Sequence, residues 1–263
     1  DSLQAVRTRI TNSLRNRGYY FFKPEFIEYL ADSIQKPGSI ALRMTLAQNM
    51  RPLARNRYRT GDVTMYVFRN EGGGTPDTIA MPRGTLIQML PSKFRRNLMT
   101  ECVTFNRGKV FSVRDMDRTQ SYLARLGIFN AISISALPDT LAADPTLDVA
   151  ISCTFDMPLE TSIEANVSSK SNSYLGPGLT LGLTNRNMFG GGEQLSVNLT
   201  GSYEWQTGRG SSSVFNSYEV GLTGSLAFPR FIAPKFIPRR KYSSNWTRVS
   251  LNADLLNRPH SFT

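Results

Sequence analysis

The stretch LTLGLT at residues 179–184 alternates apolar residues with polar or small ones, as do LSVNLT at 195–200 and VSLNADL at 249–255. Alternation with a period of two is typical of β-strands that have two unlike faces. A strand that crosses a bilayer needs about 9–11 residues, with lipid on one side and water on the other. The length of the runs and the Thr, Asn, Ser and Gly of the second face favour transmembrane β-strands for residues 159–263. A soluble module built of two β-sheets is the alternative.

Five strands are expected in this region, joined by connections of alternating character. The FGGGE turn at 189–193 is tight, whereas residues 206–216 form a longer stretch rich in Ser and Gly. Bacterial barrels have short periplasmic turns and longer outer loops. FGGGE lacks the Lys-Ser/Thr and the helix that follow a phosphate-binding loop, so the sequence predicts a hairpin there. The expected strands are 160–169, 179–188, 194–205, 217–228 and 246–256.

The net charge of +11 lies in one half of the chain. Residues 1–130 hold 21 Lys and Arg against 10 Asp and Glu, and residues 131–263 hold 10 of each. The basic half is interpreted as a solvated surface or one attracted to anionic lipid headgroups or acidic client chains. No nucleic-acid motif surrounds the arginines, so nucleic acid is not an expected partner. No apolar run approaches the ~18–20 residues of a membrane helix.

The residues that usually carry catalysis or bind metals are scarce. The chain has one histidine, His260, and two cysteines, Cys102 and Cys153, without C-x-x-C spacing. The cysteines are interpreted as two buried thiols or as one bridge formed in an oxidising compartment. No Gly-x-Ser-x-Gly motif is present. The sequence therefore predicts no enzyme, no cofactor and no metal site.

Residues 1–158 are expected to alternate helices and strands. The sequence predicts a loop at 71–76, a turn at 36–39 and Ser92 as a helix cap. SLRNRGYYFF at 13–22 repeats the features of YLARLGIFNA at 122–131, namely a helix end, a glycine, an aromatic residue and a strand. Expected helices are 3–17, 92–102 and 113–126, and expected strands are 26–31, 40–46, 63–68, 128–137 and 147–155.

These patterns resemble a known family. Residues 113–152, VRDMDRTQSYLARLGIFNAISISALPD…LDVAIS, resemble a polypeptide-transport-associated (POTRA) domain. Residues 176–205, GPGLTLGLTNRNMFGGGEQLSVNLTGSYEW, resemble the opening barrel strands of the BamA/TamA superfamily. LRNRGYYFFKPEFIEYLAD at 14–32 resembles the TamA-like branch of Bacteroidetes-type bacteria, whose members are often lipoproteins. The family's Arg-Gly-Phe/Tyr barrel-loop motif and a lipid-anchor cysteine have no counterpart here.

The resemblance implies α+β POTRA domains (βααββ) followed by the first antiparallel strands of a transmembrane β-barrel. The implied division is a partial POTRA domain at 1–50, a complete one at 51–158 and the incomplete N-terminal strands of an outer-membrane barrel at 159–263. Five strands do not close a barrel, and closure is what removes free strand edges from lipid. We therefore expect the chain to be part of a larger one.

The implied function is that of an assembly or insertion factor in the bacterial outer membrane, with its POTRA domains in the periplasm. Its partners would be unfolded outer-membrane protein clients, outer-membrane lipid and accessory assembly lipoproteins. Such a protein satisfies the backbone groups of a client by offering it a strand edge.

Two strand edges are candidate client-binding sites. One is the POTRA edge, which consists of Ile132, Ser133 and Ile134; the alternative is a strand whose side chains face its own helices. The other is the first barrel strand as a lateral seam, and the alternative is an ordinary barrel strand. Ile163, Ala165 and Val167 give this strand a thin apolar face, and Glu164, Asn166, Ser168 and Ser169 are assigned to the other. The seam residues are Glu160, Thr161, Ser162, Ile163, Glu164, Ala165, Asn166, Val167 and Ser168.

Other classes of protein fit parts of the pattern. A secretion pore of the two-partner type has the same order of POTRA domains and barrel. A soluble binding module would bury Leu181, Leu199 and Leu251 in a sandwich core. An enzyme would need a catalytic domain upstream, and a passive porin is disfavoured because porins lack POTRA units.

Overall fold

The computed structural model describes residues 2–32, 40–69, 77–89, 95–139, 144–169, 174–206, 216–229 and 246–257. These residues divide into two compact units. The first comprises residues 1–91, 99–124 and 131–155, and the second comprises 92–98, 125–130 and 156–263.

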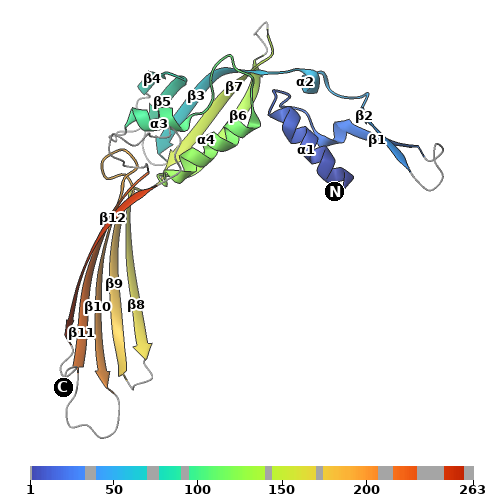
Figure 1. Cartoon of the computed structure of the whole chain (residues 1–263). Helices are drawn as coiled ribbons and strands as arrows, with labels where there is room; N and C mark the ends of the chain where they lie inside the picture. The colour runs from blue at the N-terminus through green and yellow to red at the C-terminus, as the bar shows by residue number, and fades with distance from the viewer. Residues whose placement is uncertain are drawn as a thin grey trace, which may run out of the picture. The chain divides into compact units, whose positions relative to one another are not determined.

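The first unit begins with a helix and a two-stranded hairpin (Figure 1). Helix α1 (Leu3–Arg15) starts at Ser2, whose hydroxyl accepts a hydrogen bond from the amide of Ala5, a normal N-cap. The chain leaves the helix through Gly18, whose φ of +99° favours glycine. The turn η1 (Pro24–Phe26) leads to β1 (Ile27–Asp32), which pairs antiparallel with β2 (Ala41–Leu46), and α2 (Pro52–Arg55) follows.

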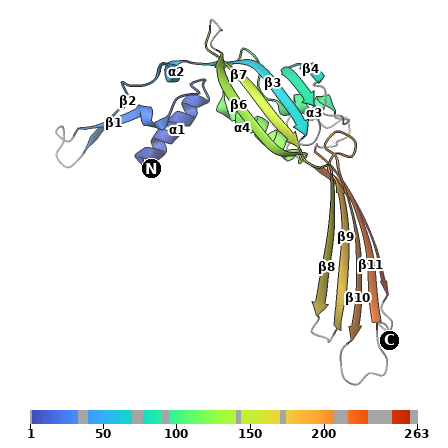
Figure 2. The same ribbon diagram turned by 180° about the vertical axis from the view of Figure 1, so that it is seen from behind.

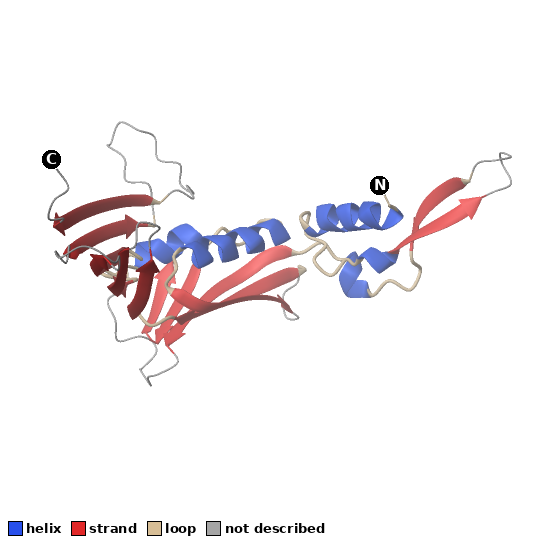
Figure 3. Cartoon of the chain, turned by 90° about the horizontal axis from the view of Figure 1, so that it is seen from below, coloured by secondary structure: helices blue, strands red, loops and turns tan. Residues whose placement is uncertain are grey.

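A five-stranded mixed sheet with the helices α3 and α4 makes up most of the rest of the first unit, and its strand order is β4-β5-β3-β7-β6. Strand β3 pairs parallel with both β5 and β7, whereas β4 pairs antiparallel with β5. Figures 1 to 3 show α4 lying along β6 and β7. The elements are β3 (Arg59–Arg69), β4 (Asp77–Met81), β5 (Gly84–Met89), α3 (Arg96–Cys102), α4 (Val113–Arg125), β6 (Phe129–Asp139) and β7 (Thr146–Phe155).

The core of the first unit is built from the inward face of this sheet. Alternate residues of β7 are buried; Leu147 and Ile151 have no exposed surface, and Met65 of β3 is equally buried. Phe111, which follows α3, and Leu123 of α4 are also fully buried. A period-two face under amphipathic helices explains why β3 and β7 can be read from the sequence.

The second unit contains an antiparallel sheet in the order β12-β11-β10-β9-β8. Neighbours in sequence are neighbours in the sheet, so the chain forms a simple meander. Each strand has 11 to 13 residues. The strands are β8 (Leu159–Ser169), β9 (Tyr174–Asn185), β10 (Gln194–Gln206), β11 (Asn216–Phe228) and β12 (Thr247–Asn257).

The sequence predicted most of these elements, with clear exceptions. All five strands expected after residue 158 are present, although β9 begins at Tyr174 rather than near residue 179. The hairpin β4–β5 and the helix α2 were missed, so a hairpin separates β3 from α3 where the expected order had only a connection. The predicted turn at 36–39, the loop at 71–76 and the Ser92 cap lie outside the described residues.

Among the described helices, none combines the length and apolar character that crossing a membrane requires.

Candidate functional site

The strand register places the apolar residues of β8–β12 in rows across one face. Ile163 pairs with Leu181, Leu181 with Leu199, and Leu199 with Leu222. A parallel row runs from Leu179 through Gly201 and Val220 to Leu255. Because side chains alternate along each strand, all of these point to the same side. The sheet therefore has a continuous apolar face.

This apolar face is exposed. Leu181, Leu199 and Leu222 of the three central strands keep 40%, 44% and 49% of their surface accessible. On the outer strands the values rise to 72% for Ile163 and 78% for Leu251. Contiguous apolar patches of this kind on a water-soluble protein normally mark a contact with another apolar medium.

The opposite face is polar and more closely packed. Ser162, Gly182, Asn198, Thr223 and Asn252 form one row across all five strands. The side chains of Ser162 and Asn198 fill the space where a Cβ of Gly182 would stand. In the same way, the side chains of Thr200 and Asp254 occupy the space where a Cβ of Gly221 would stand. On the central strands the polar face is thus less accessible than the apolar one, because Asn198 and Thr223 are half-buried whereas Leu199 and Leu222 are exposed. This is the reverse of the burial in a water-soluble sheet.

Aromatic residues gather at the end of the apolar face that lies far from the FGGGE turn. Tyr203 pairs with Tyr218 across β10 and β11. Trp205 lies two residues further along β10, and its ring is 6.1 Å from that of Tyr203. Barrel strands carry such aromatic girdles where the membrane meets water. This cluster was not predicted from the sequence, although the spacing of Tyr203 and Trp205 in SYEW places both on the apolar face.

The sheet ends in two strands that have a single neighbour each within the described residues. Strand β8 pairs only with β9 there, and β12 only with β11. Every residue of β8 is exposed, and so is all of β12 after Thr247. The predicted seam residues 160–168 therefore lie together on an edge strand, with a row of backbone groups facing outward.

The faces of β8 differ from the prediction at one position. Ile163, Ala165 and Val167 share the apolar face, and Glu164, Asn166 and Ser168 share the polar one, as expected. Ser169 was assigned to the polar face, but it pairs with Leu175 and lies on the apolar side. The reason is that successive side chains of a strand point to opposite faces, so Ser168 and Ser169 cannot lie on the same one.

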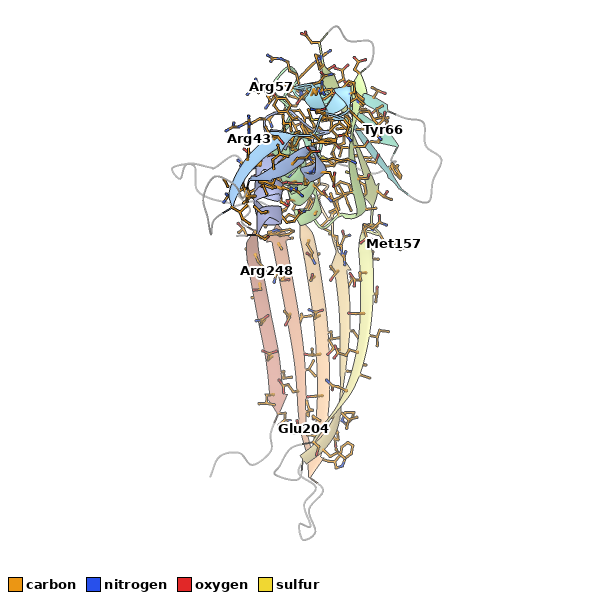
Figure 4. The ribbon with its side chains drawn as sticks, turned by 90° about the vertical axis from the view of Figure 1, so that its right-hand side faces the viewer. Arg43, Arg57, Tyr66, Met157, Glu204 and Arg248 are labelled. Atoms are coloured by element: carbon orange, nitrogen blue, oxygen red, sulfur yellow. The ribbon has the colours of Figure 1, made fainter. Side chains whose placement is uncertain are left out.

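The base of β8 is tied to the end of β9 by Arg186. Its guanidinium donates to the carboxylate of Asp156 at 3.0 Å and also to that of Glu160. Its backbone amide donates to the carbonyl of Pro158 at 2.8 Å. In Figure 4, Met157 and Arg248 lie at this end of the strands and Glu204 at the other. The edge strand is therefore anchored at its first residues.

The glycine hairpin between β9 and β10 is organised around a buried carboxylate. Glu193 is 3% exposed and accepts the amide of Gly191 at 2.8 Å. Arg95 donates to Glu193 from its guanidinium at 3.2 Å and to the carbonyl of Gly190 from its backbone amide at 2.8 Å. Gly190 and Gly192 have φ of 77° and 75°, conformations that suit glycine. The predicted hairpin is present, and no helix follows it.

The predicted POTRA-edge residues Ile132, Ser133 and Ile134 lie in β6, which is an edge strand of the mixed sheet. Ser133 is exposed, and both isoleucines are half-buried. The position of β6 at the edge agrees with the edge interpretation, and the half-buried isoleucines agree with its alternative. Their role in client binding stays a prediction.

The two cysteines are free thiols and both are buried. Burial raises the pKa of Cys102 to about 12, with Glu101 adding to the shift, and burial also raises that of Cys153 to about 12. Burial raises the pKa of Asp115 as well, against the opposing effect of Arg118. In the described part of the chain, no three His, Cys, Asp or Glu side chains come together as metal ligands would.

Comparisons with known proteins yield structural matches only. No family model and no curated protein matches the sequence. The crystal structure of BamA from Haemophilus ducreyi lacking POTRA domains 1–3 matches with a TM-score of 0.43 and 15% identity, covering 97% of this chain and 45% of that one. CdiB from Acinetobacter baumannii matches with a TM-score of 0.40 and 12% identity, covering 97% and 46%. The chain thus spans about half the length of each.

Proposed function

We propose that β8–β12 form part of the wall of a transmembrane β-barrel in a bacterial outer membrane. The observation that carries this proposal is the open apolar face. One of its rows runs across the strands from Ile163 to Leu222, and the Tyr203–Tyr218 pair lies near the end of the strands. From Leu195 to Trp205 the face spans ten residue steps, or roughly 34 Å at ~3.4 Å per residue. Tilted by ~35–45°, a strand of that length rises about 24–28 Å, which matches the ~25 Å apolar band of an outer-membrane barrel.

Within this barrel, the chain acts as an assembly or insertion factor of the BamA/TamA kind. An unfolded client strand carries backbone groups that cost several kcal/mol each when they are left unpaired in hydrocarbon. The fully exposed edge of β8 offers matching partners. Its thin apolar face consists of Leu159, Ile163, Ala165 and Val167, with Thr161 and Ser169 on the same side, and offers few competing contacts. The mixed sheet serves as a periplasmic POTRA domain, and its edge strand β6 offers a second place for strand addition.

A secretion pore of the two-partner type is the second candidate function, and the packed polar face favours it. In a pore, the client would pass along Ser162, Asn198 and Thr223 rather than pair with an edge. The two functions therefore use different parts of the same sheet, and probes placed at two asparagines can distinguish them. Asn166 lies on the edge strand β8, and Asn198 lies on the interior strand β10, both on the polar face.

Site-specific crosslinking tests the proposal. A photoreactive residue replaces either Asn166 or Asn198 in the protein in its native membrane, and captured clients are identified by mass spectrometry. The assembly function predicts capture of nascent outer-membrane barrels at residue 166 and little capture at residue 198. Predominant capture of a secreted, non-barrel chain at residue 198 would support the pore and overturn edge templating.

A further inference from the structure

A row of basic side chains crosses the first unit at the start of β3. Tyr58 is 2% exposed, its ring lies 5.5 Å from that of Phe21, and its hydroxyl donates to the carbonyl of Leu53 at 3.2 Å. With Tyr58 fixed inward in an extended segment, its neighbours Arg57 and Arg59 both lie on the outer side and are exposed. Figure 4 shows Arg57 on this surface.

Backbone carbonyls orient both arginines. The Nε of Arg57 donates to the carbonyl of Arg17 at 3.0 Å, and an Nη of Arg59 donates to the carbonyl of Gly108 at 2.8 Å. Each guanidinium keeps further N–H donors that these bonds do not use, because a guanidinium carries five. The two forks are thus held in place before any partner arrives.

The same hydrogen bonds bring other cations to the row. Arg17 lies at one end, and Arg107, which precedes Gly108, lies at the other; both are exposed. The amide of Tyr58 donates to the carbonyl of Gly18 and the amide of Thr60 to that of Lys109, at 2.9 Å and 2.8 Å. Val110 opposes Arg59, so Lys109 faces the other side. We call the set Arg17, Arg57, Arg59 and Arg107 the arginine row.

Acidic residues offset only part of this charge. Asp62 pairs with Arg107 at 3.1 Å, although both side chains are more than half exposed. Asp148 accepts the amide of Asp62 at 2.7 Å. Collecting like charges in one row works against folding unless an opposite charge binds there.

We propose that the arginine row binds an extended, acidic segment of a partner protein. The Cα atoms of Arg57 and Arg59 are ~7 Å apart because the two residues alternate along an extended segment, and alternate residues of a second extended chain repeat at the same spacing. Planar guanidinium forks bind carboxylates through two parallel hydrogen bonds, and pre-orientation lowers the entropy cost. Lipid headgroups diffuse independently and gain nothing from the fixed spacing, which favours a polypeptide. This interaction does not depend on the membrane function proposed above.

Fluorescence anisotropy on the full chain in a non-ionic detergent tests the proposal. The probe is a labelled peptide of alternating Glu and Thr, and the control peptide has the same composition with its Glu residues in one block. The variant R57E/R59E reverses the row, and the variant K23E/R43E makes the same change of charge at exposed residues elsewhere in the unit.

We expect the alternating peptide to bind more tightly than the block peptide, and salt to weaken its binding. R57E/R59E should weaken it by roughly tenfold or more, whereas K23E/R43E should change it by less than about threefold. Equal losses in the two variants would reduce the effect to net charge and overturn the proposal. Failure to bind the peptide, or tighter binding to anionic phospholipid vesicles that R57E/R59E abolishes, would also overturn it.

Discussion

The two five-stranded sheets of this chain share an alternation of apolar and polar residues, but the apolar face is buried in one sheet and exposed in the other. In the mixed sheet, the inward face of β7 is closed, and Leu147 and Ile151 have no accessible surface. In the antiparallel sheet, Leu181 and Leu199 remain 40% and 44% accessible. The alternation of apolar and polar residues thus fixes which side chains share a face, but not what that face meets.

The difference lies in what covers each face. In the first unit, Phe111 and Leu123 are fully buried together with the inward residues of the mixed sheet. In the second unit, the apolar face of β8–β12 stays open in the described residues, while side chains such as Asn198 fill in its polar face. Leaving one Leu in water rather than burying it forfeits about 1.5–3 kcal/mol. A face with many such residues is stable only against lipid or another apolar surface.

The largest effect should come from a cavity in the closed sheet. Ile151→Ala removes buried volume from β7 and should cost ~2–5 kcal/mol, whereas Leu181→Ala on the open face leaves no enclosed cavity and should cost less than ~1 kcal/mol in detergent. Hydrogen exchange resolved by segment, in increasing urea, measures both values. Equal losses of protection would mean that the two sheets are packed alike, and the comparison would fail.

A charge on either face of β10 should sharpen the comparison next. Leu199→Arg places a cation on the apolar face and should cost ~2–4 kcal/mol at the middle of the bilayer, because lipid cannot solvate it. Asn198→Arg places the same charge on the polar face and should cost much less. Folding into lipid vesicles, followed by protease protection, compares the two variants. Equal yields, including failure of both variants, would reject the assignment of faces.

The sequence was sufficient for elements with a strong local pattern. Helix α4, strand β7 and the five strands of the second unit follow from periodicity and from glycine stops such as Gly127, whose φ is +64°. The hairpin β4–β5 was missed because its strands are short and lack a long alternating run. Its turn depends on Gly84, which has a φ of +157° and lies so close to the carbonyl of Val63 that a Cβ would clash. That approach is a long-range contact and leaves no local signal.

For the candidate site, the sequence identified an edge strand but not its setting. The period of two placed Asn166 and Ile163 on opposite faces of β8, which the register confirms. The Arg95–Glu193 pair joins residues 98 positions apart, so it could not be read from spacing. The role of residues 160–168 as a client-binding seam stays a prediction that the crosslinking experiment tests.

The buried carboxylate of the glycine hairpin gives a smaller effect. Arg95→Ala leaves Glu193 without its cation and should destabilise the hairpin by ~1.5–3 kcal/mol, the usual value for a hydrogen bond to a charged group. Arg186→Ala removes two ion pairs at the same end of the sheet, but their carboxylates, on Asp156 and Glu160, are more exposed than that of Glu193, so it should cost about 1 kcal/mol or less. Faster hydrogen exchange at Gly191 in Arg95→Ala alone is the expected observation. Unchanged exchange there would mean that the hairpin keeps its shape without Arg95.

The smallest effect should come from the reactivity of the native cysteines. It tests whether the core of the mixed sheet is closed, and it needs no substitution in that sheet. A thiol reacts as its thiolate, and burial raises the pKa of Cys102 and Cys153 from 9.0 to about 12. At pH 8 their thiolate fraction is then roughly a thousandfold below that of an ordinary thiol, and it rises about tenfold per pH unit. Ser162→Cys on the exposed strand β8 provides the matched control. Iodoacetamide at pH 8, followed by mass spectrometry, should modify residue 162 first and the native cysteines only after urea unfolds the chain. Rapid modification of Cys153 in the folded protein would show that the mixed sheet opens as readily as the antiparallel one, and the contrast between the two sheets would then be one of sequence rather than of packing.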